Sequence, residues 1–229
     1  MFSRLQRWFG NGWMGIAELL ITVFCVFLSL SFHEYMHGYA AYKMGDDTAK
    51  NMGRLNMSPL SHIDPIGAVC LFLFGFGWAR PVPINPNNFR AGKMKQGMVI
   101  TALAGPVGNL IMAFVSLLLM RIIGRVYGNM SGVAAIVVTV VYILLSVLES
   151  MNLALAVFNL IPVPPLDGSK ILNAVLPARM YFRLMQYEQY GFIILIILIN
   201  LPIFDRFLYL LTGGIETFFN LIIGLIPFL

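Results

Sequence analysis

Long uninterrupted apolar stretches are the feature that most constrains how this chain can fold. They run from about residue 15 to 42, from 97 to 123 and from 133 to 161, and each exceeds the roughly 18 residues that suffice to cross a bilayer. Charged residues make up 11% of the sequence, well below the roughly 25% of an average globular domain. The chain is therefore predicted to be an all-α polytopic membrane protein.

Two further regions decide the predicted number of spans. The apolar run at 66–78 is too short for an ordinary span and contains Gly75 and Gly77, so a small re-entrant β-hairpin-like insertion is expected there. Residues 190–229 supply one or two more spans, because Pro202 interrupts the run. We expect five to six transmembrane helices in one domain, 1–229, with a core at about 15–172 and C-terminal spans at about 190–229.

The distribution of basic residues predicts the orientation of the chain in the membrane. Seven of the 15 Lys and Arg side chains lie between the first two clear spans, and this region is expected to face the cytosol; they are Lys43, Lys50, Arg54, Arg80, Arg90, Lys93 and Lys95. The N-terminus of a multi-pass cell-membrane protein would then lie outside. The net charge of +5 is explained by this topology, so no nucleic-acid partner is expected.

The first span contains the sequence His33-Glu34-Tyr35-Met36-His37. An ionisable side chain at membrane depth costs several kcal/mol unless it is paired or functional. Positions i and i+4 share one face of a helix, so the two imidazoles can bind one metal ion while Glu34 reaches a water on that ion. A catalytic zinc site needs a third protein ligand and one open position.

Asp167 is the best candidate for the third ligand. It follows Pro162, Pro164 and Pro165, which end the helix of the third span, so its carboxylate lies on irregular backbone. The first and third spans both run toward the cytosol in the predicted topology. His33, His37 and Asp167 are therefore expected to meet at a similar depth, with the metal site toward the cytosolic side.

Simpler interpretations apply to each of these polar residues. The His-Glu-His group is alternatively a buried polar cluster between helices, and Asp167-Gly168 alternatively a turn. For His62 we prefer a polar neighbour of a helix that begins at Asp64-Pro65.

Three polar residues in the second and third apolar stretches each have two possible roles. Asn109 either hydrogen-bonds between helices or faces the substrate. Glu149 and Asn152 either line a water path to the metal, or Glu149 pairs with a basic group. The rival function from another class is a membrane metal-ion transporter, because intramembrane His and Asp also mark ion pathways.

The motifs HEYMH, AGPVGN and NLIPVPPLDG occur in an order that resembles the site-2 protease family of intramembrane zinc metalloproteases. The segments GRLNMSPLSHIDPIG and FGFGWARPVPINP are similar to that family as well, so the resemblance covers roughly Phe32 to Leu172. The short loop at 124–132 leaves no room for the PDZ module of some members, and no cystathionine-synthase-type domain is expected after the last spans. The resemblance implies a minimal catalytic core.

The resemblance also implies an activity and the residues that perform it. One zinc ion per chain would be bound by His33, His37 and Asp167, with Glu34 as the catalytic acid/base. Asn159 and Asn109 would line the site and contact the substrate or the developing oxyanion. The expected reaction is hydrolysis of a peptide bond in or near a transmembrane segment of another membrane protein, within the lipid bilayer. The segment 74–86 is expected to hold that substrate as an added strand.

Overall fold

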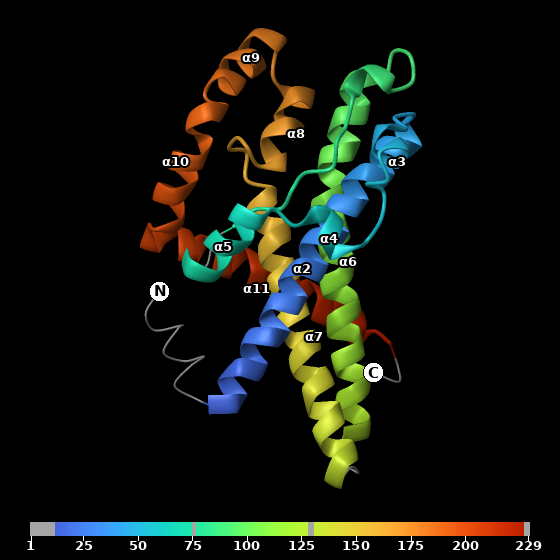
Figure 1. The fold of residues 1–229 in the computed structure, drawn as a ribbon, viewed down its shortest axis with the longest axis vertical. Coiled ribbons are helices and arrows are strands. Elements are labelled where there is room, and N and C mark those ends of the chain that lie inside the picture. Colours follow the sequence, from blue (N-terminus) through green and yellow to red (C-terminus); the bar gives the residue numbers. More distant parts are fainter. Residues whose placement is uncertain (1–11, 75–76, 128–130, 227–229) are drawn as a thin grey trace.

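The computed structural model describes residues 12–74, 77–127 and 131–226, which fold mainly into α-helices (Figure 1). Four of the described helices are long and apolar enough to cross a membrane: α2 (Gly12–Met44), α6 (Met94–Tyr127), α7 (Gly132–Asn159) and α11 (Pro202–Gly224). The three apolar stretches of the sequence form α2, α6 and α7. The prediction of an α-helical protein with several membrane spans is therefore confirmed.

The centre of the molecule is a bundle of α2, α6 and α7 (Figure 1). α6 and α7 are consecutive and antiparallel, and α2 crosses both of them. One buried hydrophobic cluster joins α6 and α7 to the C-terminal helix α11; it consists of Ala113, Leu117, Met120, Leu145, Leu153, Phe219 and Ile223. Small residues bring α2 and α6 close together, since a Cβ atom on Gly108 would lie 2.5 Å from Met36 Cγ.

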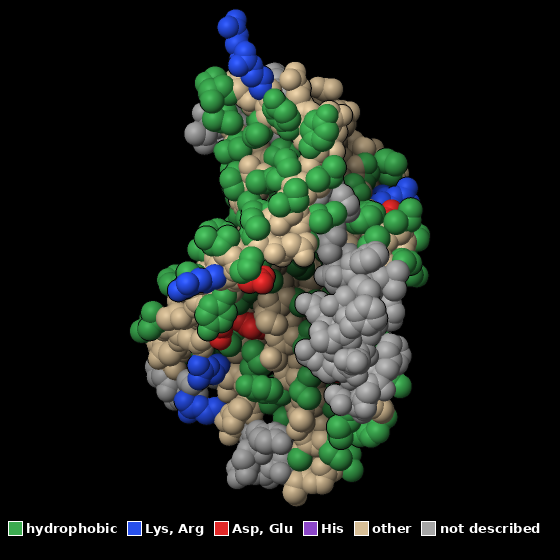
Figure 2. All heavy atoms as spheres, turned by 90° about the vertical axis from the view of Figure 1, so that its left-hand side faces the viewer, with side chains coloured by type: hydrophobic (Ala, Val, Ile, Leu, Met, Phe, Trp, Pro, Cys, Tyr) green, Lys and Arg blue, Asp and Glu red, His purple; other side chains and the backbone are tan. Residues whose placement is uncertain are grey.

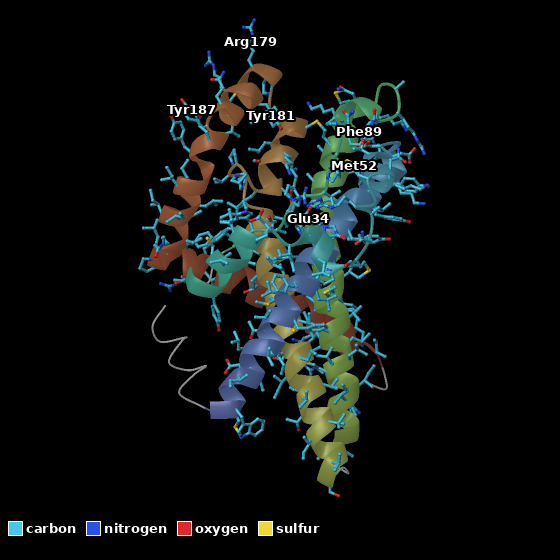
Figure 3. The ribbon with its side chains drawn as sticks, in the orientation of Figure 1. Glu34, Met52, Phe89, Arg179, Tyr181 and Tyr187 are labelled. Carbon is cyan, nitrogen blue, oxygen red and sulfur yellow. The ribbon has the colours of Figure 1, made fainter. Side chains whose placement is uncertain are left out.

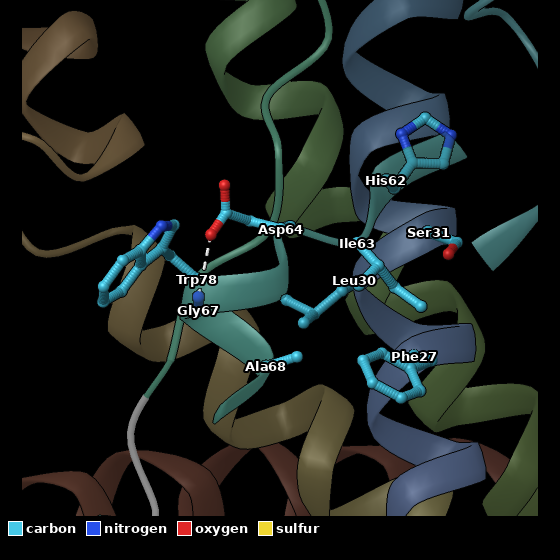
Figure 4. A pocket seen from close by; sticks show the side chains of 10 residues that line it. Phe27, Leu30, Ser31, His62, Ile63, Asp64, Gly67, Ala68 and Trp78 are labelled. Atoms are coloured by element: carbon cyan, nitrogen blue, oxygen red, sulfur yellow. Dashed lines mark hydrogen bonds between the residues drawn. The ribbon is translucent and has the colours of Figure 1, made fainter. Parts of the chain in front are cut away.

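Short elements connect α2 to α6, namely α3 (Thr48–Asn51), α4 (Pro59–His62), α5 (Pro65–Phe74) and the 3-10 helix η1 (Pro86–Asn88). Asp64 Oδ1 accepts the Gly67 N–H at 2.8 Å and so caps the start of α5. This confirms the helix start predicted at Asp64-Pro65. Figure 4 shows this corner, in which His62, Asp64 and Trp78 line a small pocket against α2.

The β-hairpin expected around residues 66–78 is not confirmed. Residues 65–74 form the helix α5 instead, and Gly75 lies outside the described residues. Among the described residues of this region, β pairing is limited to one isolated antiparallel bridge between Ile63 and Ala79. The physical reason is that a short continuous apolar run satisfies a buried helix as well as a strand.

The C-terminal part consists of α8 (Asp167–Val175), α9 (Ala178–Gln186), α10 (Glu188–Ile199) and α11. α10 has 12 residues, so it is about 18 Å long and too short to cross a hydrocarbon core of about 30 Å. The helix α10 ends before Pro202, where α11 begins. The described residues thus contain four candidate spans, and the predicted count of five to six is not confirmed.

Hydrophobic side chains cover much of the surface of the molecule, as the face in Figure 2 shows. On α10, for example, Ile193 and Ile197 are both more than half exposed. Exposed apolar area of this extent on long helices matches a lipid environment, not water.

Candidate metal centre

His33, His37 and Asp167 come together inside the bundle, and all three side chains are buried. The Nε2 atoms of the two histidines are 2.9 Å apart. Asp167 Oδ2 lies 3.1 Å from His33 Nε2 and 2.9 Å from His37 Nε2. The structure therefore assembles the three residues that the sequence indicated, although Asp167 is 134 positions from His33.

Local structure explains how each donor reaches this point. The histidines lie one turn apart on α2 and share a face. Asp167 is the first residue of α8, where the chain turns back over the end of α7. That turn is tight, because a Cβ atom on Gly168 would lie 2.3 Å from the carbonyl oxygen of Leu160. Glycine at this position allows Asp167 to approach α2.

The donor atoms fit a zinc ion by their chemistry and spacing. His37 Nδ1 lies 2.6 Å from the carbonyl oxygen of Thr101, and since a carbonyl only accepts, Nδ1 of the neutral ring carries the proton and Nε2 carries a lone pair. That lone pair faces the Asp167 carboxylate and the other imidazole, so a cation between them is favoured. Ligand atoms of a tetrahedral zinc ion lie about 3.3 Å apart for bonds of about 2.0 Å, which is close to the distances observed.

α6 closes the site from one side through Gly105. A Cβ atom on Gly105 would lie 2.4 Å from His37 Nε2 and 2.6 Å from His33 Cε1. Both distances are far below van der Waals contact, so any side chain at this position would displace the imidazole rings. The sequence signal for this contact is the small-residue motif AGPVGN, whose exact partner the sequence alone did not identify.

The second carboxylate oxygen of Asp167 also has a hydrogen-bond partner. Lys170 Nζ donates to Asp167 Oδ1 at 3.1 Å from a half-exposed position. Burial acts to raise the pKa of Asp167, and the positive charge of Lys170 acts to lower it. The ionised carboxylate is the form that binds a metal ion. Lys170 is not among the site residues predicted from the sequence, although its position one turn after Asp167 indicates this contact.

Glu34 lies beside the histidines on α2 and contacts an extended segment, residues 78–84, which precedes η1 (Figure 3). Its Oε2 atom accepts the Val82 N–H at 2.8 Å. The segment itself is held by Arg54, whose Nη2 atom donates to the carbonyl oxygens of Arg80 and Pro81. The described part of the chain thus places backbone of extended conformation directly next to Glu34.

The two asparagines and the third histidine differ in their surroundings. Asn109 is fully buried one turn beyond Gly105, and neither amide atom has a partner among the described residues. Asn159 is half-buried at the end of α7 and donates to the carbonyl oxygen of Leu155, a bond that does not connect it to the histidines. His62 lies outside the cluster, with Nε2 2.8 Å from the Asn56 carbonyl oxygen.

Comparison with known proteins gives one family for the chain. The sequence model of peptidase family M50 matches residues 21–201. YwhC of Bacillus subtilis (strain 168), named as a candidate zinc metalloprotease, is 39% identical over 87% of this chain and 89% of its own length. Rip2 of Mycolicibacterium smegmatis, with the same kind of name, is 26% identical over 80% of this chain and 67% of its own length.

A further relative matches a smaller part of the chain. Zinc metalloprotease MJ0392 of Methanocaldococcus jannaschii is 29% identical over 67% of this chain and 34% of its own length. No solved structure gives a significant match to the chain.

Proposed function

Since the chain belongs to peptidase family M50, it is an intramembrane zinc metalloprotease, and we propose that His33, His37 and Asp167 bind its zinc ion while Glu34 transfers the proton. The observation that carries the residue assignment is the convergence of two imidazole Nε2 atoms and one carboxylate oxygen within 4.8 Å of one another in the interior of the bundle. One zinc ion per chain accounts for all three donors.

The reaction follows from the roles of these groups. Bound zinc supplies Lewis acidity, which activates a water and polarises the scissile carbonyl. Glu34 adjoins the first ligand in the sequence, and its carboxylate accepts the proton of the attacking water and later delivers it to the leaving amine. Lys170 and the carbonyl of Thr101 fix the orientation of Asp167 and His37.

Amide donors are proposed to stabilise the oxyanion. We assign this role to Asn109 and Asn159. Asn109 supports the assignment by its burial one turn from Gly105 and by its unpartnered amide. A donor of this kind contributes about 3 kcal/mol to the transition state in other hydrolases.

The substrate is proposed to be a transmembrane segment of another membrane protein, unwound near the cleaved bond. A helix hides its carbonyl groups in its own hydrogen bonds, whereas residues 78–84 lie extended beside Glu34. An unwound substrate can pair with such a segment as an added strand. We further propose that α5 and this segment together form a re-entrant element of the membrane domain.

The proposed placement in the cell membrane follows the basic residues. The connection between α2 and α6 would face the cytosol and the N-terminus the outside, with the metal centre toward the cytosolic side. We propose that the whole chain acts as one domain, with α10 and α11 completing the membrane-embedded unit. The rival function, metal-ion transport, is not favoured, because the family and the relatives' names are those of proteases.

The decisive experiment compares Glu34→Gln with the wild type and with Glu18→Gln, a matched change on the same helix. The purified full-length proteins are placed in lipid nanodiscs with a panel of single-span membrane proteins. We expect one zinc ion per chain in all three, and cleavage by the wild type and Glu18→Gln only. Cleavage by Glu34→Gln would contradict the role of Glu34, and zinc flux into vesicles without cleavage would favour the transporter.

A further inference from the structure

A polar cavity of about 530 Å³ lies between α6, α7 and α11, in the half of the bundle where α6 and α7 are joined. Its wall includes two arginines, two glutamates, a serine and a tyrosine: Arg121, Arg125, Glu149, Glu216, Ser146 and Tyr142. The catalytic residues proposed above do not belong to this wall. A cavity with this lining and size has room for several waters, each of which occupies about 30 Å³ in the liquid.

The α7 wall of this cavity leads inward to Glu149. Tyr142, Ser146 and Glu149 are spaced i, i+4 and i+7, so they lie on one face of α7. Glu149 is only 7% exposed, and its Oε1 atom has no hydrogen-bond partner in the described part of the chain. A buried carboxyl oxygen at membrane depth is costly without a hydrogen-bond donor, so this atom marks a position where the cavity must supply one.

A second polar layer lies between Glu149 and the metal centre. Asn152, one turn further along α7, donates to Ser29 Oγ at 2.8 Å, and Ser29 lies one turn before His33 on α2. Asn109 is in the corresponding position on α6, one turn beyond Gly105. Oδ1 of Asn152 and both amide atoms of Asn109 have no partner among the residues that the structure describes.

These unpartnered atoms need an explanation that helix packing does not give. Hydrogen bonding between helices accounts for the Asn152–Ser29 contact. It does not account for the acceptor of Asn152 or for the amide of Asn109. Buried polar groups in proteins are almost always paired, and when protein atoms do not pair them, ordered water does.

We propose that a file of ordered waters runs from the cavity past Glu149, Asn152 and Asn109 to the metal centre, and that it supplies the water consumed in hydrolysis. This inference rests on the proposed function, since each peptide bond cleaved consumes one water. Its oxygen bonds to the carbonyl carbon, and its protons end on the new amine and carboxyl groups.

The test uses Asn152→Leu, which keeps the branched shape of the side chain but removes its polar atoms. Asn200→Leu is the matched control, because Asn200 donates to the carbonyl of Ile196 in the same i−4 geometry that Asn152 makes with Leu148, at the distant end of α10. The full-length proteins are studied in nanodiscs by radiolytic hydroxyl-radical footprinting, which labels side chains next to bound water. Zinc content, kcat and KM are measured on the same samples.

In the wild type we expect the buried Leu148 and Leu153 to be labelled faster than the buried Phe204, after correction for intrinsic reactivity. Asn152→Leu should lower that labelling severalfold and kcat about tenfold, with zinc content and KM unchanged. Asn200→Leu should behave as the wild type, and Asn152→Ser, which retains a hydroxyl, should restore much of both signals.

A second variant changes a side chain outside the packed core. Ser146 is exposed on the cavity wall, so Ser146→Leu narrows the cavity without disturbing the packed layers and should also slow the labelling of Leu148. Slow labelling of Leu148 and Leu153 in the wild type would overturn the proposal, as would unchanged labelling and kcat in both variants. Normal labelling and zinc content without any proteolysis would instead refute the proposed function and leave the water file standing.

Discussion

Replacing Gly105 by alanine should weaken zinc binding strongly while leaving the helix intact. The added Cβ atom would lie 2.4 Å from His37 Nε2, against 3.4 Å or more for ordinary contact, so the ring has to move by about 1 Å. Zinc–ligand distances in working sites hold to within about 0.2 Å. A loss of about 100-fold in affinity, or about 2.7 kcal/mol, is therefore expected, at the upper end of measured losses for changes behind a metal ligand.

The same helix offers a control for this change. A Cβ atom on Gly124 would meet no heavy atom within 4 Å beyond its own helix turn, and alanine improves helix propensity by about 1 kcal/mol at either site. Gly124→Ala should therefore bind zinc as the wild type does. The assay is competition with a fluorescent chelator at pH 7 on purified protein. An affinity of Gly105→Ala within threefold of Gly124→Ala would refute the account of how α6 closes the site.

Three further predictions follow from other contacts. Gly168→Ala should lower the free energy of unfolding by about 2 kcal/mol in thermal melts, because the new Cβ atom meets backbone oxygen of Leu160 at 2.3 Å. Burial acts to raise the pKa of Asp46, but hydrogen bonds from Thr48, Asn85 and Asn88 lower it below its usual value; the stability advantage over Asp46→Asn should therefore be full above about pH 4 and shrink as the pH falls below it. Chelation of zinc should speed limited proteolysis of residues 160–167. Equal proteolysis rates with and without the chelator would contradict this prediction.

The long spans could be predicted from local sequence, and the clustering of His33, His37 and Asp167 from local sequence together with topology. Apolar length alone indicated α2, α6 and α7. The spacing of His33 and His37 fixed their common face, and the prolines before Asp167 fixed the end of the helix that carries it. Topology then predicted their meeting, and the three side chains lie within hydrogen-bond distance of one another in the structure.

The parts that the sequence did not predict depend on contacts between distant segments. The apolar run that forms α5 has no hydrophobic periodicity by which a buried helix could be distinguished from a strand. The hydrogen bond from Val82 to Glu34 spans 48 positions, and the fit of Gly105 against two imidazole rings depends on the crossing of α2 and α6. Pro202 predicted a helix boundary at that position. Whether α10 is long enough to cross the membrane depends on where α9 ends, which the sequence did not indicate.

The distance along the chain between the donors has a consequence for biosynthesis. His33 and Asp167 are 134 positions apart, and the helices α6 and α7 separate them. A nascent polypeptide that has emerged only as far as α7 carries both imidazoles but lacks the carboxylate that completes the triad. The proposed metal centre can therefore assemble only after the third long helix and the turn that follows it have been inserted.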